Sequence, residues 1–496
     1  MTILGTRRDT AENDKTPSSG ARRGVLERLF KITERGSTTG REIRGGLVTF
    51  FAMAYIVILN PLILGGTSAG NAPTDVAGGW LATAQVGAVT GLAAGVLTIL
   101  FGLVANLPFA LAAGLGINSF LAVAVVGDVT WPEAMGLVLI NGLLIVLLAA
   151  TGARSAIFNA VPRQLKAAIT VGIGLFIAFI GFVDAGFVTP TEGGPPVQLG
   201  DGGSITTVPT MIFVFGLLLM GILVSRGVKG GLLIGLVGTT IVAIVVEAVL
   251  QLGPASDDNP GGWHLSVPAL PDSLVSVPDL SLLGQFSFGA FDRIGALAAT
   301  MLVFTLFFTN FFDAMGTMTG LAKQGGLADK DGNFPKIKSA LVVEGVGAVV
   351  GGASSSSSNT VFVDSAAGVG EGARTGLASV VTGGLFLVAM FLTPLTAVVP
   401  IEVASGALVV VGAMMMREIK EIDLGDFSVA LPVFLTVVTM PLTYSIANGI
   451  GIGFITWVLL RFACGRARDV HPLLWVVAAG FLVYFVRGPL SAALGA

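Results

Sequence analysis

The chain has 496 residues, of which 53% are hydrophobic and 11% are charged, and its mean hydropathy is +0.88. A soluble globular domain carries about 25% charged residues, so the composition excludes a soluble protein and predicts one embedded in a lipid bilayer. The net charge of −3 favours no partner, the single cysteine excludes an internal disulfide, and two histidines exclude a histidine-rich metal site.

Residues 1–44 are polar and rich in Arg and Lys. They lack the short apolar core and the small-residue cleavage site of a signal peptide. We therefore expect a largely disordered, basic cytoplasmic tail with a short surface helix near residues 26–30.

Fourteen hydrophobic segments follow, and a membrane span needs about 20 apolar residues, or fewer where the helix is broken. The expected helices are residues 46–65, 80–104, 108–126, 135–152, 163–186, 207–225, 230–251, 294–321, 339–352, 362–372, 375–396, 400–416, 427–444 and 447–464. The fold class expected from this pattern is an all-α polytopic membrane protein.

The third and tenth of these segments are too short and too rich in glycine for ordinary spanning helices. Residues 112–116 read Ala-Ala-Gly-Leu-Gly and residues 366–370 read Ala-Ala-Gly-Val-Gly. Irregular backbone at membrane depth is tolerated only where it lines a protein-enclosed or watery cavity. Matched breaks in two halves of a chain point to the substrate site of a transporter. The serine-rich segment 354–363 is expected to be a short extended strand that leads into the second half-helix.

Lysine and arginine residues near helix ends set the orientation. None occurs between Gly45 and Ala153, and fourteen spans that start inside place the later basic clusters on the cytoplasmic face. The long outside loop, 253–292, then separates two seven-helix repeats, 45–252 and 293–465. Because each repeat has an odd number of spans, the second enters the membrane with opposite polarity, as in an inverted repeat.

A second internal match supports this repeat. A Val-Pro pair precedes Gly174 and Gly412 at identical spacing, at the start of the fifth helix of each repeat. Residues 466–496 are expected to be a cytoplasmic or interfacial segment, and whether 472–486 cross the membrane stays open.

Three polar residues lie where the membrane makes them costly. A carboxylate near the bilayer centre costs about 2.5–3.5 kcal/mol on insertion scales. Asp313 lies in an apolar stretch, and Asp364 immediately precedes the second break. We interpret both as ligands for substrate and proton; the alternatives are a protonated acid bonded to a neighbouring helix for Asp313 and a helix cap for Asp364. Asn118 follows the first break, where its amide suits the edge of a heterocycle or an interhelical hydrogen bond.

Further substrate contacts are expected next to these residues. Gly116, Ser365 and Ala366 lie in the two breaks, and Phe51 and Tyr55 on the first helix could stack on a flat ligand, although an aromatic residue there more often packs against its neighbours. The remaining acidic candidates rank behind these: Glu247, Glu344, Glu371 and Glu402. No catalytic residue and no metal site are expected.

Several segments together carry a family resemblance. They read Met-Ala-Tyr-Ile-Val at 53–57 with Asn60 and Pro61, Ala-Ala-Gly-Leu-Gly-Ile-Asn at 112–118, Phe-Asp-Ala-Met-Gly-Thr at 312–317, Asp-Ser-Ala-Ala-Gly-Val-Gly at 364–370, Gly-Ala-Arg-Thr-Gly-Leu at 372–377 and Met-Pro-Leu-Thr-Tyr-Ser-Ile-Ala-Asn-Gly-Ile at 440–450. In this order they resemble the AzgA-type purine permeases, a branch of the nucleobase–cation symporters with the uracil-permease fold.

The resemblance implies a core domain, about 45–152 plus 293–396, that moves against a gate domain, about 160–252 plus 400–465. It implies that cargo binds between the third and tenth half-helices, with proton coupling. The family's binding residues fall on Asn118, Asp313 and Asp364.

The chain departs from the family pattern around this pocket. The family usually has Glu at Asp364, Tyr-Ile where residues 362–363 are Phe-Val, an acid at Asn310 and Pro at Ala113. The preference of the family for adenine, guanine and hypoxanthine therefore does not transfer unchanged.

The sequence predicts a secondary transporter, not an enzyme, that imports purine nucleobases by proton symport with an elevator-like motion of core against gate. Two acids favour bases that donate hydrogen bonds, such as guanine and hypoxanthine.

The proton is the coupling ion and no cofactor is expected; the partners are the base, the bilayer and a second copy in a homodimer, but not nucleic acid. The expected location is the plasma membrane, with the N-terminus in the cytoplasm. The alternatives are a carrier of xanthine, uracil or a sulfate-like anion on the same fold, and an ion channel.

Overall fold

The computed structural model describes residues 25–66, 72–152, 160–191, 196–256, 258–264, 266–271, 273–328, 334–396 and 398–486. Within these residues the structure is mostly helical and contains three two-stranded sheets. Nine of the described helices are long and apolar enough to cross a membrane. The protein is therefore a mainly helical, multi-pass membrane protein.

The first half of the chain contributes, in order, α1 (Val25–Phe30), α2 (Thr39–Met53), α3 (Ile56–Leu64), β1 (Gly65–Gly66), β2 (Leu81–Ala82), α4 (Thr83–Val104), β3 (Leu111–Ala113), α5 (Leu115–Phe120), the π-helical η2 (Leu121–Val125), α6 (Trp131–Thr151), α8 (Arg163–Asp184), β4 (Val188–Pro190), β5 (Val197–Leu199), α9 (Val208–Ser225) and α10 (Gly231–Leu250). The second half contributes α11 (Ala290–Arg293), α12 (Ala296–Gln324), α13 (Ile337–Ala353), β6 (Asn359–Val361), η3 (Val363–Ser365), α14 (Ala366–Gly370), α15 (Gly376–Ala389), η4 (Met390–Leu395), α16 (Ile401–Met415), η5 (Met416–Glu421), α17 (Phe427–Leu442), α18 (Ile446–Ala463), η6 (Ala467–Asp469) and α19 (Pro472–Phe485).

The first predicted helix, 46–65, differs from the structure at both its start and its middle. Helix α2 begins at Thr39, because the side chain of Thr38 caps it by accepting a hydrogen bond from Arg41 N. A turn at Ala54 and Tyr55 then separates α2 from α3. The helix therefore begins earlier than predicted, and the span Thr39–Leu64 contains an irregular turn that the apolar pattern did not show.

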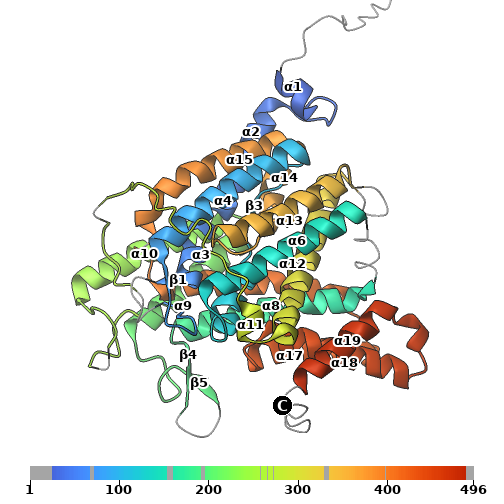
Figure 1. Cartoon of the computed structure of the whole chain (residues 1–496). Coiled ribbons are helices and arrows are strands. Elements are labelled where there is room, and N and C mark those ends of the chain that lie inside the picture. The colour runs from blue at the N-terminus through green and yellow to red at the C-terminus, as the bar shows by residue number, and fades with distance from the viewer. Residues whose placement is uncertain are drawn as a thin grey trace, which may run out of the picture.

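One group of helices packs through glycine. Helix α4 lies against α15 and α13, and α13 lies against α6, so these four run side by side (Figure 1). The backbones approach so closely at one crossing that a Cβ on Gly376 would lie 1.8 Å from Gly102 O, and a Cβ on Gly102 would lie 2.4 Å from Gly376 O. Small residues at such crossings are the usual means by which helices associate in membranes.

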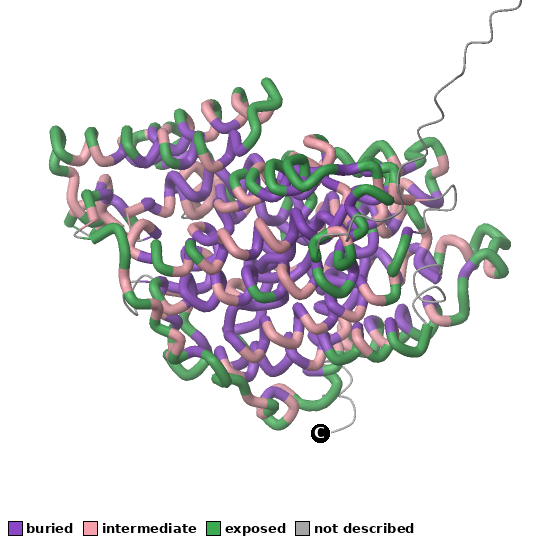
Figure 2. The backbone as a smooth tube through the Cα atoms, turned by 90° about the horizontal axis from the view of Figure 1, so that it is seen from above, coloured by how far each residue is buried: buried purple, intermediate pink, exposed green. Residues whose placement is uncertain are grey.

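A second group packs around α8, which contacts α16 and α17, while α9 contacts α10 and α16. Buried residues fill the middle of the molecule and exposed residues surround it (Figure 2). On α9 and α10 the exposed side chains are themselves apolar, for example Leu218 at 60% and Val249 at 74%. An exposed apolar surface on a long helix is what contact with lipid requires.

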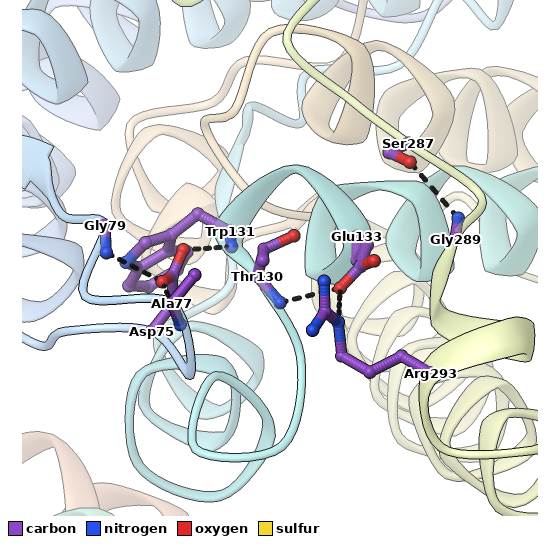
Figure 3. A network of polar contacts seen from close by, with 9 residues as sticks. All are labelled: Asp75, Ala77, Gly79, Thr130, Trp131, Glu133, Ser287, Gly289 and Arg293. Atoms are coloured by element: carbon purple, nitrogen blue, oxygen red, sulfur yellow. Dashed lines mark hydrogen bonds and ion pairs between the residues drawn. The ribbon is translucent and has the colours of Figure 1, made fainter.

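A polar network ties the start of α6 to α11 (Figure 3). Thr130 and Glu133 form a capping box, and Glu133 also pairs with Arg293 at 2.7 Å. Asp75 accepts hydrogen bonds from the backbone N–H groups of Trp131 at 2.9 Å and Gly79 at 2.7 Å. These contacts fix the ends of elements from both halves of the chain.

The crossing of α4 and α15 predicts a steric effect of Gly376→Ala. The added methyl group would collide with the backbone of Gly102, so we expect a loss of about 1–3 kcal/mol in stability. Thermal unfolding of the purified protein in detergent measures this. Gly384→Ala, on the same helix with open space around its Cβ, is the matched control and should not destabilise. Equal melting temperatures for the two variants would contradict the packing described here.

Candidate substrate site

Two distant segments of the chain cross at the centre of the candidate site. Strand β3 pairs antiparallel with β6, in the register Leu111 to Val361, Ala112 to Thr360 and Ala113 to Asn359. The pairing is extended by Gly114 N, which donates to Ser358 O at 2.9 Å, and by Phe362 N, which donates to Ala110 O at 2.9 Å. Each strand leads into a short helical segment, α5 after β3 and η3 with α14 after β6. The crossing therefore satisfies the backbone groups that these irregular segments would otherwise leave unpaired.

The serine run before β6 is a turn, whereas the sequence predicted an extended strand from 354 to 363. Ser355 and Ser357 have φ values of 57° and 69°, in the left-handed region. The hydroxyl groups of Ser354 and Ser356 lie 3.0 Å apart, and Asn359 Nδ2 donates to Ser356 Oγ and to Ser357 O. Short polar side chains that bond to nearby backbone favour turns over strands.

Asp364 lies in η3, directly after the crossing. Its Oδ2 accepts a hydrogen bond of 3.0 Å from the hydroxyl group of Tyr55, which is 2% exposed and lies at the turn between α2 and α3. Tyr55 therefore reaches the predicted site, but as a hydrogen-bond donor to the acid. Phe51 does not reach it: this side chain is 54% exposed and lies beside Gly230.

Asp313 lies on α12, the helix that contacts β6, η3, α14 and α5. Asn310, one turn earlier, ties α12 to the crossing because its Nδ2 donates to Ser358 Oγ at 2.9 Å. Helix α12, on which Asp313 lies, thus contacts both irregular segments where they meet.

Glu344, a lower-ranked candidate from the sequence, bonds directly to the crossing. It lies on α13, is fully buried, and its Oε2 accepts a hydrogen bond of 3.2 Å from Val361 N in β6. Its Oε1 has no hydrogen-bond partner among the described residues. The membrane cost of a carboxylate inside the predicted span 339–352 was the signal that marked it.

Asn118 lies on α5 and is fully buried. Its Nδ2 donates to Oδ1 of Asn60 on α3, and its own Oδ1 has no hydrogen-bond partner among the described residues. A buried, unpaired oxygen costs free energy in a finished structure. An oxygen of this kind beside the crossing is a candidate acceptor for a bound molecule.

The other predicted contacts have structural partners. Ser365 Oγ accepts a hydrogen bond of 3.0 Å from Ala110 N, so this side chain holds the crossing together. Ala366 O lies 3.5 Å from Gln324 Nε2. Gly116 lets α5 approach α8, because a Cβ there would lie 2.7 Å from Ile173 Cγ2.

Comparison with known proteins now identifies the family. A model described as the permease family matches residues 40–452. The chain belongs to this family. Membership makes the protein a transporter and not an enzyme, and it agrees with the resemblance drawn from the sequence motifs.

Curated permeases match this permease over nearly its whole length. The guanine/hypoxanthine permease PbuG of Bacillus subtilis is 35% identical over 463 residues, which are 93% of this chain and 99% of that one. The adenine permease AdeP of Escherichia coli is 35% identical over 473 residues, 95% and 98% of the two chains. The putative permease MJ0326 of Methanocaldococcus jannaschii is 37% identical over 465 residues, 93% and 98%.

Solved structures share the fold at low sequence identity. The transmembrane domain of the cyanobacterial bicarbonate transporter BicA superposes with a TM-score of 0.55 and 16% identity, over 82% of this chain and 96% of that one. The murine anion transporter Slc26a9 in its inward-facing state gives a TM-score of 0.57 and 11% identity, over 93% and 77%. At these identities the likeness concerns the fold alone.

The bond between Glu344 and Val361 predicts how the permease responds to two substitutions. Glu344→Leu removes the acceptor and leaves a buried N–H unpaired, which costs about 1–3 kcal/mol. Glu344→Gln keeps an acceptor oxygen at the same place and should lose much less. Thermal unfolding of the purified variants checks this, and equal losses for Leu and Gln would show that the bond does not support the crossing.

Proposed function

We propose that this permease is a secondary active transporter that imports purine nucleobases by proton symport. The observation that carries the proposal is the crossing of β3 and β6, which has Asp364 at its end and is contacted by α12, the helix of Asp313. The chain also resembles curated guanine/hypoxanthine and adenine permeases over more than nine-tenths of its length. Asn118, Asp313 and Asp364 are the proposed substrate ligands.

The chemistry of these ligands favours a base with N–H groups. Ionised carboxylates only accept hydrogen bonds, a protonated carboxyl group keeps an acceptor oxygen, and the free atom of Asn118 is an oxygen. Guanine offers adjacent N–H donors on its ring edge and hypoxanthine offers one, whereas the corresponding ring nitrogen of adenine is an acceptor. The proposed preference is therefore for guanine and hypoxanthine, with adenine as the weaker cargo.

Proton coupling follows from the cost of moving charge through the protein. A loaded site with two ionised acids would carry negative charge through a low-dielectric barrier, and protonation removes it. The proton gradient would then drive uptake, with about 2.3 kcal/mol per charge for each 100 mV of membrane potential. Asp313 and Asp364 are the proposed proton carriers, and no other cofactor is part of the proposal.

The proposed topology has fourteen segments in two inverted repeats of seven. Gly174 and Gly412, which occupy matching sequence positions, also touch: a Cβ on Gly174 would lie 2.7 Å from Gly412 O, and one on Gly412 would lie 2.3 Å from Gly174 O. Such reciprocal contact is what a two-fold relation between repeats produces.

The proposed motion is a core domain, 45–152 plus 293–396, sliding against a gate domain, 160–252 plus 400–465. Glu371 of the core pairs with Arg44 of α2 at 2.8 Å and with Lys229 of the gate. The pair with Lys229 must break or rearrange when the two domains shift. The proposed location is the plasma membrane with the N-terminus in the cytoplasm, and a homodimer in the bilayer is part of the same proposal.

A second candidate is an anion carrier, the activity named for the solved structures that share this fold. Bicarbonate or sulfate would meet ionised acids at the site and be repelled unless these are protonated. Uptake of labelled guanine in competition with bicarbonate, sulfate, xanthine and uracil separates this candidate from the first.

The proton role of Asp313 predicts that Asp313→Asn abolishes accumulation of labelled guanine driven by a pH gradient, because an amide cannot carry the proton. Uptake should fall to the background of cells that lack the permease. Asp292→Asn, at an exposed acid on α11, is the control and should retain uptake. Full gradient-driven uptake by Asp313→Asn would refute the assignment.

The pair of Lys229 and Glu371 predicts a test of the motion. Cysteines at both positions, in a chain whose Cys464 is replaced by serine, should abolish uptake when joined by a bifunctional thiosulfonate cross-linker and restore it when the cross-link is reduced. A cysteine pair at Arg163 and Glu421, which form an ion pair within the gate domain, should leave uptake unchanged. Continued transport with the first pair cross-linked would exclude sliding at this interface.

A further inference from the structure

Asn60 sits at the centre of a fully buried amide network. It lies on α3, one residue before Pro61, and its side chain is 0% exposed. Its Nδ2 donates to Thr90 Oγ1 on α4 at 2.8 Å and to the backbone oxygen of Ser356 at 3.1 Å. Its Oδ1 accepts a hydrogen bond from Asn118.

The direction of every bond in this network is set at its ends. Ser356 O is a backbone carbonyl and can only accept, so the atom of Asn60 that faces it must be the NH₂ group. The hydroxyl group of Thr90 donates to Val86 O at 2.6 Å, so it too is left to accept from Asn60. Because both ends demand a donor, the oxygen of the Asn60 amide must face Asn118.

This orientation fixes the amide of Asn118 in turn. The atom of Asn118 that meets Asn60 Oδ1 must be the NH₂ group, and the opposite atom is the oxygen, which is buried and unpaired within the described part of the chain. An amide free to turn would offer either a donor or an acceptor. Here the backbone of Ser356, acting through Asn60, leaves only the acceptor.

We propose that Asn60 is a positioning residue that holds Asn118 with its carbonyl oxygen toward the cargo and so selects cargo that donates a hydrogen bond there. The inference rests on the proposed function of this site. With Asp313 and Asp364, it makes the three ligands of the site acceptors when the acids are ionised. A purine with N–H groups matches such a set, whereas a ring nitrogen placed against Asn118 Oδ1 would bring two lone pairs together.

The test is a ratio of inhibition constants, because a ratio is not moved by a general loss of stability or expression. Uptake of labelled hypoxanthine is measured in cells without their own purine permeases, with unlabelled guanine and adenine as competitors. Asn60→Ala frees the Asn118 amide to turn and present its NH₂ group to an acceptor nitrogen. We expect the preference for guanine over adenine to fall about tenfold, the value of one hydrogen bond.

Two further variants make the result decisive. Thr90→Val removes one of the two acceptors to which Asn60 donates. It should lower the guanine-over-adenine preference by a smaller factor than Asn60→Ala does. Asn141→Ala is the matched control: this asparagine on α6 is also fully buried, and neither of its amide atoms bonds to the network among the described residues. Its ratio should equal that of the unmodified permease.

The outcomes separate the two levels of the argument. A guanine-to-adenine ratio unchanged in Asn60→Ala, as in Asn141→Ala, would overturn the positioning role and leave the proposed function intact. If Asn60→Ala does not reach the membrane, the ratio in Thr90→Val decides the question. Failure of the unmodified permease to take up any purine would remove the proposed function, and the inference with it.

Discussion

The structure depends on how backbone polar groups are satisfied inside a membrane. The segments that contain β3 and β6 are not continuous helices. Each strand would leave unpaired N–H and C=O groups inside the membrane if it stood alone. Their antiparallel pairing, in the register Ala112 to Thr360, resolves this requirement for both segments. The same pairing brings residues more than two hundred positions apart in sequence into one place, where the proposed site lies.

Several buried polar side chains form hydrogen bonds to the residues of this crossing. The side chains of Ser365 and Glu344 accept hydrogen bonds from the backbone N–H groups of Ala110 and Val361. The side chain of Asn310 donates one to the hydroxyl group of Ser358. The donors and acceptors of these side chains are used to keep irregular backbone in place. Asp313, Asp364 and the oxygen of Asn118 lie on the elements so fixed, which is how a rigid scaffold presents a few polar groups to a ligand.

The sequence predicted the long helices well because apolar length has a simple meaning in a bilayer. It also predicted two breaks with polar residues beside them, since glycine-rich segments and costly acids are visible letter by letter. It missed the turn at Tyr55, because the apolar sequence there is continuous. The hydrogen bond from Tyr55 to Asp364, 309 residues away, is seen only in the structure. It ranked Glu344 low and gave Asn60 no role beyond its place in a family motif, because the hydrogen-bond partners of both residues are visible only in the folded chain.

The central claim is that a purine base binds between α5 and η3, held by Asn118, Asp313 and Asp364. The most direct measurement is an experimental structure of the permease with guanine bound in a lipid nanodisc. Our account predicts density for the base beside the crossing of β3 and β6, with N–H groups within hydrogen-bond distance of these three side chains. A base bound elsewhere in the protein, or with the crossing opened and Asn118 turned to present its NH₂ group, would contradict it.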